Sequence, residues 1–169
     1  MIETTISKSV EWETPPDFIA PLKQAFTFTL DVCAARPNIC DRYYDRETDG
    51  LAQDWAGEVF WMNPPYGRAG NISAWLQKAY LSATQPWTLG VVLAPARTST
   101  IWFHKYIAKA QLVCFVKGRI TFVDGPTGKT LSPAQFPNCL AVFGNKRLIT
   151  TRQIETLRGY GWLAAGGDL

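Results

Sequence analysis

Four consecutive residues, Asn63-Pro64-Pro65-Tyr66, carry the groups needed to hold a planar amine. The lone pair of an aromatic amine is delocalised into its ring, so attack on an activated methyl group needs two acceptors that hold the N–H groups and favour a pyramidal nitrogen. The Asn63 side-chain oxygen can be one acceptor and the Pro64 carbonyl the other. Both prolines restrict the backbone and pre-position that carbonyl. The motif therefore predicts methylation of an exocyclic amine on a nucleobase.

Tyr66 offers an aromatic face on which the target base can stack, which is worth roughly 1–3 kcal/mol in single-strand binding sites. In duplex DNA the base would have to flip out of the stack to reach such a pocket. This chemistry needs no strong general base, and the one histidine of the chain, His104, is far from the motif in sequence. The structural alternative for the same four residues is a rigid turn with the tyrosine packed on the core.

The motif follows an apolar run at 59–62 that predicts a strand, and strand ends are where ligand sites form in α/β folds. Apolar residues at offsets 0, 3, 4, 7, 8 and 11 from Ile72 predict an amphipathic helix. Further strands are predicted at 28–32, 89–94, 112–116, 119–123 and 139–143, and further helices at 14–26 (capped by Thr14, kinked at Pro21), 103–110 and 150–157.

This alternation predicts an α/β fold with helices on both faces of a mixed sheet, whose C-terminal strands are antiparallel. Residues 1–9 are expected to form a loose arm, 124–137 a Gly/Pro-rich loop, and 164–169 a fraying end. With 169 residues, 47% hydrophobic and 18% charged, the chain is expected to form one domain. No segment has the pattern of a membrane span or a secretory signal, so we expect a cytoplasmic protein without membrane contact.

The cysteines and the charges suggest which partners to expect. Cys33, Cys40, Cys114 and Cys139 lack the spacing of a zinc site, so we expect reduced, partly buried thiols and no metal. Residues 1–96 carry seven Lys/Arg against eleven Asp/Glu, whereas residues 97–158 carry ten against two. The basic part is suited to a polyanion such as a nucleic-acid backbone, although a solvated basic surface without a partner gives the same count.

Six sequence blocks resemble, in the same order, those of the phage-encoded DNA N-6-adenine methyltransferase family. The resemblance covers most of residues 11–143 and implies a Rossmann-like fold, S-adenosylmethionine as methyl donor and adenine in DNA as acceptor. The blocks are Trp12-x-Thr14-Pro15, Phe28-x-Leu30-Asp31-Val32-Cys33-Ala34, Asp49-Gly50-Leu51 with Asp54-Trp55, Asn63-Pro64-Pro65-Tyr66, Pro95-Ala96-Arg97-Thr98 with Trp102-Phe103, and Gly118-Arg119-Ile120-x-Phe122.

The same resemblance implies a set of cofactor-binding residues. Thr14 and Pro15 would lie near the methionine end of the cofactor, the loop from Asp31 would form its first contact, and Asp49 to Leu51 would meet its adenine. Independently of the resemblance, a carboxylate such as Asp31 at a strand end can bind an ammonium group. The full set is Trp12, Thr14, Pro15, Asp31, Val32, Cys33, Ala34, Asp49, Gly50, Leu51 and Asn63.

Four features of this set leave alternatives open. Asp31 could instead cap a helix or form a salt bridge, and Asp49-Gly50 could be a simple turn. The loop after Asp31 lacks the glycines that are common in methyltransferases. The acidic residue that would bind the ribose is not evident, with Asp41 and Asp45 as weak candidates.

A separate target-recognition domain does not fit, so DNA readout is expected from loops 67–71 and 124–137. The candidate phosphate or base contacts are Arg68, Arg97, Lys117, Arg119 and Lys129, each of which could equally be an ordinary surface cation. We expect weak or short-site specificity unless the protein dimerises, and the sequence leaves monomer and homodimer open. The rival acceptors are RNA adenine, cytosine N4 and a protein glutamine, and the non-enzymatic rival is a DNA-binding module without catalysis.

Overall fold

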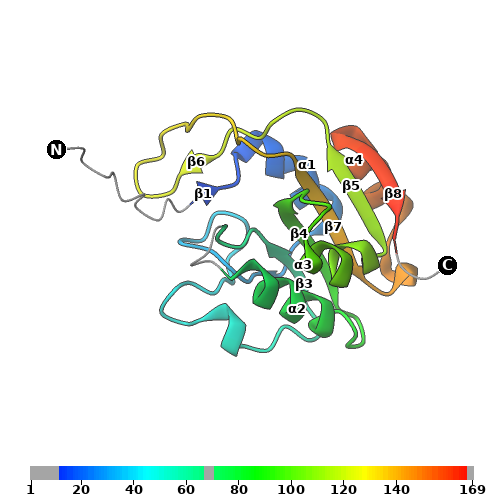
Figure 1. The fold of residues 1–169 in the computed structure, drawn as a ribbon. Coiled ribbons are helices and arrows are strands. Elements are labelled where there is room, and N and C mark those ends of the chain that lie inside the picture. The colour runs from blue at the N-terminus through cyan, green and yellow to red at the C-terminus, as the bar shows by residue number, and fades with distance from the viewer. Residues whose placement is uncertain (1–11, 67–70, 167–169) are drawn as a thin grey trace.

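A six-stranded mixed sheet forms the centre of the fold in the computed structural model, which describes residues 12–66 and 71–166 (Figure 1). The predicted arm at 1–9 lies outside these residues. In spatial order the strands are β2 (Leu30–Asp31), β3 (Val59–Met62), β4 (Leu89–Pro95), β7 (Asn138–Gly144), β5 (Leu112–Val116) and β8 (Gly161–Ala165).

The direction of the strands changes at the middle of the sheet. β2, β3 and β4 are parallel, whereas β7 runs antiparallel to both β4 and β5, and β5 runs antiparallel to β8. β4 is buried along its whole length, as its apolar sequence predicts for a central strand. The predicted mixed sheet with antiparallel C-terminal strands is therefore confirmed.

Helices cover both faces of this sheet, which was also predicted. On one face, α2 (Ile72–Ser82) and α3 (Ile101–Lys105) pack on a core that includes Val92. On the other face, α1 (Pro16–Phe26) and α4 (Thr151–Tyr160) pack on a core that includes Val91. Figure 1 shows the two helix pairs on opposite sides of the strands. Alternate residues of one strand thus supply two separate cores.

Short elements complete the framework. Within residues 12–66 and 71–166 there are three 3-10 helices, η1 (Gly50–Ala52), η2 (Ile107–Lys109) and η3 (Lys146–Leu148). A separate two-stranded sheet joins β1 (Trp12–Glu13) to β6 (Val123–Asp124) in antiparallel register. This small sheet connects the start of the described chain to the predicted loop 124–137 (Figure 1).

Several local predictions were wrong or too long. Residues 119–123 form a strand only from Val123 onward, because the backbone of Ile120 and Phe122 pairs with the loop residues Ala134 and Leu131. The strand predicted at 28–32 is assigned only at its centre, since it lies at the edge of the sheet. The helix predicted at 103–110 is divided into α3 and η2.

The predicted fraying at 164–169 was also wrong for its first residues. Ala164 and Ala165 belong to β8 and pair with Val113 and Leu112, so the end of the chain closes the sheet. Residues 167–169 lie outside the described part of the chain. At the other end, Thr14 does not cap α1, because Pro15 is the capping residue and no side chain bonds the first turn. The helix runs through Pro21 without interruption.

Candidate active site

The Asn63 side chain is fixed by two hydrogen bonds at the carboxyl end of β3. Its Nδ2 donates to the Trp12 carbonyl at 3.0 Å and to the Thr14 Oγ1 at 3.2 Å. Because a carbonyl can only accept, the amide nitrogen must face Trp12 and the oxygen must face the other way. The Thr14 hydroxyl, which was expected to cap a helix, thus holds Asn63 instead. The β1 strand therefore orients the amide of the predicted catalytic motif.

Tyr66 has two acceptors for a single hydroxyl proton. Its Oη lies 2.7 Å from the Asn63 Oδ1 and 3.2 Å from the Leu93 carbonyl of β4. Burial raises the pKa of the Tyr66 hydroxyl well above its usual 10, so this group stays protonated at neutral pH. The hydroxyl can thus turn to Leu93 without losing a hydrogen bond, and the Asn63 oxygen then becomes available to another donor.

Four aromatic rings surround the motif on the face of the sheet that carries α1 and α4. Trp12 stacks on Phe122 and Phe136 with ring centroids 5.3 and 6.0 Å apart. Tyr66 meets all three rings edge-on, at centroid distances of 5.6 to 6.2 Å. Phe122 is 1% exposed, whereas the other three rings are half-buried. These residues form an aromatic wall, defined as Trp12, Tyr66, Phe122 and Phe136, beside Asn63.

Asp31 is a buried carboxyl at the end of β2, the neighbour of β3. It is 3% exposed, and its Oδ1 accepts the Cys33 backbone N–H at 3.1 Å. Burial raises the pKa of Asp31 from 3.8 to about 7, against the lowering effect of the Cys33 N–H, and the nearby Glu13 raises it further. Glu13 itself forms a two-point ion pair with Arg36 at 2.8 Å. Two carboxyl groups near one buried position favour the binding of a cation.

The two chain segments expected to hold the cofactor lie against each other. A Cβ added to the buried Gly50 would lie 2.1 Å from the Val32 carbonyl, so only glycine permits this close approach. Asp49 precedes it in a left-handed conformation, with φ of 50°, and its carboxylate accepts the Leu51 N–H. Ala34 joins this region through its N–H, which donates to the Tyr44 carbonyl. The loop after β2 and η1 are therefore closely packed beside the buried Asp31 carboxyl.

The candidate DNA-contact residues come from several separate segments of the chain. Lys117 and Arg119 are exposed and line the same hollow of about 440 Å³, together with Pro15 at the start of α1. Arg97 is exposed just after β4, with its guanidinium 5.5 Å from the Phe136 ring centroid. Lys129 lies on the turn 124–130, whose backbone is closed by hydrogen bonds, and Arg68 lies outside the described residues. The predicted 124–137 loop is therefore a folded excursion.

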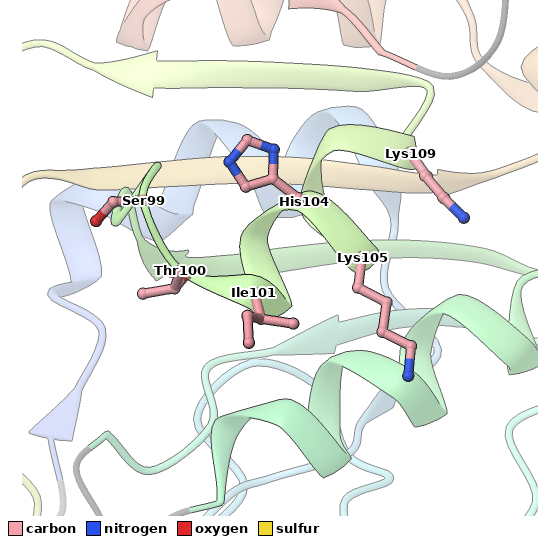
Figure 2. A pocket seen from close by; sticks show the side chains of 6 residues that line it. All are labelled: Ser99, Thr100, Ile101, His104, Lys105 and Lys109. Carbon is pink, nitrogen blue, oxygen red and sulfur yellow. The ribbon is translucent and has the colours of Figure 1, made fainter.

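A second hollow, of about 430 Å³, lies at α3 and shares no residue with the predicted motifs (Figure 2). Its histidine, His104, places Nε2 2.7 Å from the Thr98 carbonyl. Since a carbonyl only accepts, this nitrogen is a donor and is already used. Figure 2 shows Lys105 and Lys109 pointing away from the His104 ring. This hollow offers no group for the chemistry predicted from Asn63.

Sequence reasoning missed several groups that the structure brings to the site. Glu13 lies near Asp31 and belongs to the Trp12 to Pro15 block. Its position between the motif residues Trp12 and Thr14 was the signal that could have identified it. Phe136 and the Leu93 carbonyl gave no signal, because their roles arise from tertiary contacts with Tyr66. Pro64 is buried and Pro65 exposed directly after β3, as a rigid turn requires.

Two general features of the described residues bear on possible partners. No cluster of three or more His, Cys, Asp or Glu side chains suited to a metal ion occurs at 12–66 or 71–166. No helix in the same part of the chain is both long enough and apolar enough to span a bilayer. None of the four cysteines is in a disulfide. Cys33 and Cys40 are partly buried, as predicted, whereas Cys114 and Cys139 are fully buried.

Comparison with known proteins agrees with this geometry. No curated protein matches the chain. A family model described as DNA N-6-adenine-methyltransferase (Dam) matches residues 3–158, which includes Asp31, Gly50, Asn63 and the aromatic wall. Because the match covers most of the 169 residues, the chain belongs to the Dam family of DNA N-6-adenine-methyltransferases.

Proposed function

We propose that this protein transfers a methyl group from S-adenosylmethionine to N6 of an adenine that has flipped out of DNA. The observation that carries the proposal is the fixed Asn63 amide. Trp12 and Thr14 hold its nitrogen, which leaves its oxygen facing the Tyr66 hydroxyl, and we expect an amine N–H to bind this oxygen in place of the hydroxyl. This arrangement distinguishes a pre-positioned acceptor from an asparagine that only closes a turn.

The residues of the motif hold the amine in two places. Asn63 Oδ1 accepts one N6 hydrogen and the Pro64 carbonyl accepts the other, which favours a pyramidal nitrogen. When bound, S-adenosylmethionine would supply a methyl group on a positively charged sulfur: its S–C bond would break as the N–C bond forms, and the methylated amine would then release one N6 proton to water. No strong base is needed at the amine, which is consistent with the use of His104 elsewhere.

Tyr66 gates access to the Asn63 oxygen. Its hydroxyl occupies that oxygen at 2.7 Å and has the Leu93 carbonyl as a second acceptor at 3.2 Å. When the adenine amine arrives, the tyrosine proton turns to Leu93, so neither oxygen is left without a partner. The Tyr66 ring then stacks on the base, as the sequence predicted.

The cofactor lies on the β2 side of Asn63. Asp31 binds the ammonium group of the donor, with Glu13 contributing a second negative charge nearby. The Gly50 and Val32 contact shapes the wall for its adenine. Lys117, Arg119, Arg97 and Lys129 contact the DNA backbone, because all four are exposed and the segment that holds them is strongly basic.

The decisive experiment is product analysis. Purified protein is incubated with unmethylated plasmid DNA and methyl-labelled S-adenosylmethionine, the DNA is digested, and the nucleosides are resolved by mass spectrometry. We expect labelled N6-methyladenine. Labelled N4-methylcytosine would show that the acceptor is cytosine instead of adenine. Label on RNA or protein alone, or no transfer with intact donor binding, would contradict the proposal.

A further inference from the structure

Asn138 is a buried amide without a partner. It is 1% exposed, and neither its Oδ1 nor its Nδ2 has a hydrogen bond to any residue at 12–66 or 71–166. Gln153, at 6% exposed, shows how this fold treats another buried amide, since it bonds the backbone of Thr150 and of Ala25. Because native proteins pair almost all buried polar groups, an amide with both ends unpaired suggests a ligand.

Asn138 lies at the edge of the sheet where the predicted site is located. It is the first residue of β7 and pairs with Pro95, the last residue of β4. Side chains alternate along a strand, so Asn138 shares a face with Leu140, two residues further on. Leu140 belongs to the core that also contacts Tyr66 and Phe136. The Asn138 amide therefore faces the side of the sheet that carries the aromatic wall.

The order of the strands decides which ligand the amide would meet. The cofactor residues follow β2, Asn63 follows β3, and Asn138 lies beyond β4 on the opposite side of Asn63. Neighbouring strands are about 4.8 Å apart, and Asn138 is level with Pro95, two residues beyond the position level with Asn63, so the two backbones are separated by roughly 12 Å. Two asparagine side chains and the amine edge of one purine span a gap of this size. The acceptor base, not the donor, thus lies within reach of Asn138.

The chemistry of the amide matches the edge of adenine. Because Asn63 and Pro64 hold both N6 hydrogens, the group next to N6 that still lacks a partner is a ring nitrogen, which can only accept, and the Nδ2 of an asparagine can donate to it. A phosphate would instead need cations, and Asn138 offers none. We propose that Asn138 is a specificity-determining residue that reads a ring nitrogen of the target adenine while Asn63 holds its N6. The inference rests on the proposed function of the same site.

The test combines base analogues with variants at position 138. Oligonucleotides carry adenine, 7-deazaadenine or 1-deazaadenine at the methylated position, which removes N7 or N1 but keeps the amine. For the wild-type protein we expect kcat/KM to fall about tenfold or more on one of the two analogues. For Asn138→Leu, which keeps the volume but removes both polar atoms, kcat/KM on adenine falls to the same low value. The variant no longer distinguishes the analogue from adenine.

A second variant and a control make the test decisive. Asn138→Ser is measured in the same way in case the leucine variant does not fold. Asn145→Leu changes the exposed asparagine just beyond the other end of β7 and should keep the wild-type discrimination. Cofactor affinity of every variant is measured by calorimetry and should change by less than about threefold.

Three results would overturn the inference while the proposed function stands. The first is equal methylation of adenine and both analogues by the wild type, and the second is an unchanged base preference in the position-138 variants. The third is a loss of cofactor affinity in these variants with base discrimination intact, which assigns Asn138 to the donor. Failure of the wild type to methylate any DNA adenine is a different result, because it removes the proposed function itself.

Discussion

The two halves of the sheet differ in where their polar groups lie. In the parallel half, β2 and β3 end at the same edge, where Asp31 accepts the Cys33 N–H and Asn63 donates to the Trp12 carbonyl. In the antiparallel half, β5, β7 and β8 alternate in direction, so their ends are divided between two edges. Parallel pairing gathers reactive groups, whereas antiparallel pairing closes the fold.

The charges follow the same division. Residues 1–96 carry the acidic excess and include the groups proposed for chemistry, while residues 97–158 carry ten cations against two acidic residues. We therefore expect substitutions in the parallel half to change turnover and cofactor affinity. Substitutions in the antiparallel half should change stability or DNA affinity. Asn138 lies at the boundary of the two halves. Its variants therefore show whether effects on turnover are confined to the parallel half.

The largest effect is expected for Asn63→Ala. Removal of a pre-positioned acceptor should lower kcat by about 100-fold or more, in the range measured for oxyanion-hole donors. Donor affinity, measured by calorimetry, should stay within a few-fold of the wild-type value. The matched control is Asn145→Ala, at an exposed asparagine outside the site. Unchanged turnover in the Asn63 variant would rule out the proposed role.

Gly50→Ala should reduce both stability and donor affinity. The new Cβ would lie 2.1 Å from the Val32 carbonyl, a backbone atom that cannot move alone. We expect the free energy of unfolding to fall by about 1–3 kcal/mol, as for overpacked sites. Gly159→Ala is the control in the antiparallel half, because a Cβ at this helical position meets no atom within 4 Å. That variant should be slightly more stable than the wild type.

Asp31→Asn should have opposite effects on stability and on donor binding. With its pKa at about 7, folded Asp31 holds a proton from about pH 4 to 7 that the unfolded chain releases. The stability that this proton gives the folded state is therefore full below about pH 4, decreases above it, and is lost once pH rises through 7. The asparagine variant should be more stable than the wild type at pH 8, as measured by urea unfolding, and the difference should shrink at pH 5.

Donor binding gives the complementary measurement. A bound ammonium group favours ionised Asp31, so wild-type affinity should rise as pH increases from 5.5 to 7.5, by up to about tenfold per pH unit. The variant should bind more weakly and show a flatter profile. Glu155→Gln, at an exposed position on α4, is the control and should keep the wild-type slope. A wild-type profile in the Asp31 variant would remove Asp31 from the cofactor site.

Thr150→Ala examines the antiparallel half alone. Thr150 and Gln153 form a capping box at the start of α4, and its loss should cost about 1 kcal/mol of stability. For a chain of this size the melting temperature should fall by about 2–4 °C, measured by calorimetry. Turnover at 20 °C should not change. A large loss of turnover would show that α4 contributes to the site.

The smallest effect is expected for Arg119→Ala. If Arg119 contacts a phosphate, the slope of log affinity against log salt should fall by about one, measured by fluorescence anisotropy with a DNA duplex. Arg46→Ala, at an exposed arginine of the acidic part, should leave the slope unchanged. An unchanged slope in the Arg119 variant would give this residue a structural role.

The sequence was informative where local pattern decides structure. The apolar spacing from Ile72 predicts α2, the run at 59–62 gives β3, and Thr150 caps the last helix as expected. These elements carry their own signal, since burial on one face repeats with the period of the element. The position of Asn63 after a strand follows from the same signal.

Other features depended on contacts between distant residues. Ile120 and Phe122 are residue types common in strands, but their backbone carbonyls accept hydrogen bonds from loop residues. Ala164 belongs to β8, although its small side chain gives no sign of a strand in the sequence. Thr14 has the type of a capping residue, yet Asn63 uses its hydroxyl. Asn138 stands at the start of an apolar run, and only the structure reveals that its amide is unpaired.

The pairing of β1 with β6 has a consequence for folding. Trp12 holds the Asn63 amide, and Trp12 is itself paired with Asp124, which lies far along the chain. Contacts between such distant residues form late, because the loop between them must close first. A chain emerging from the ribosome can build β3 and the Asn63 turn early. It gains the final orientation of the amide only after residue 124 has been synthesised.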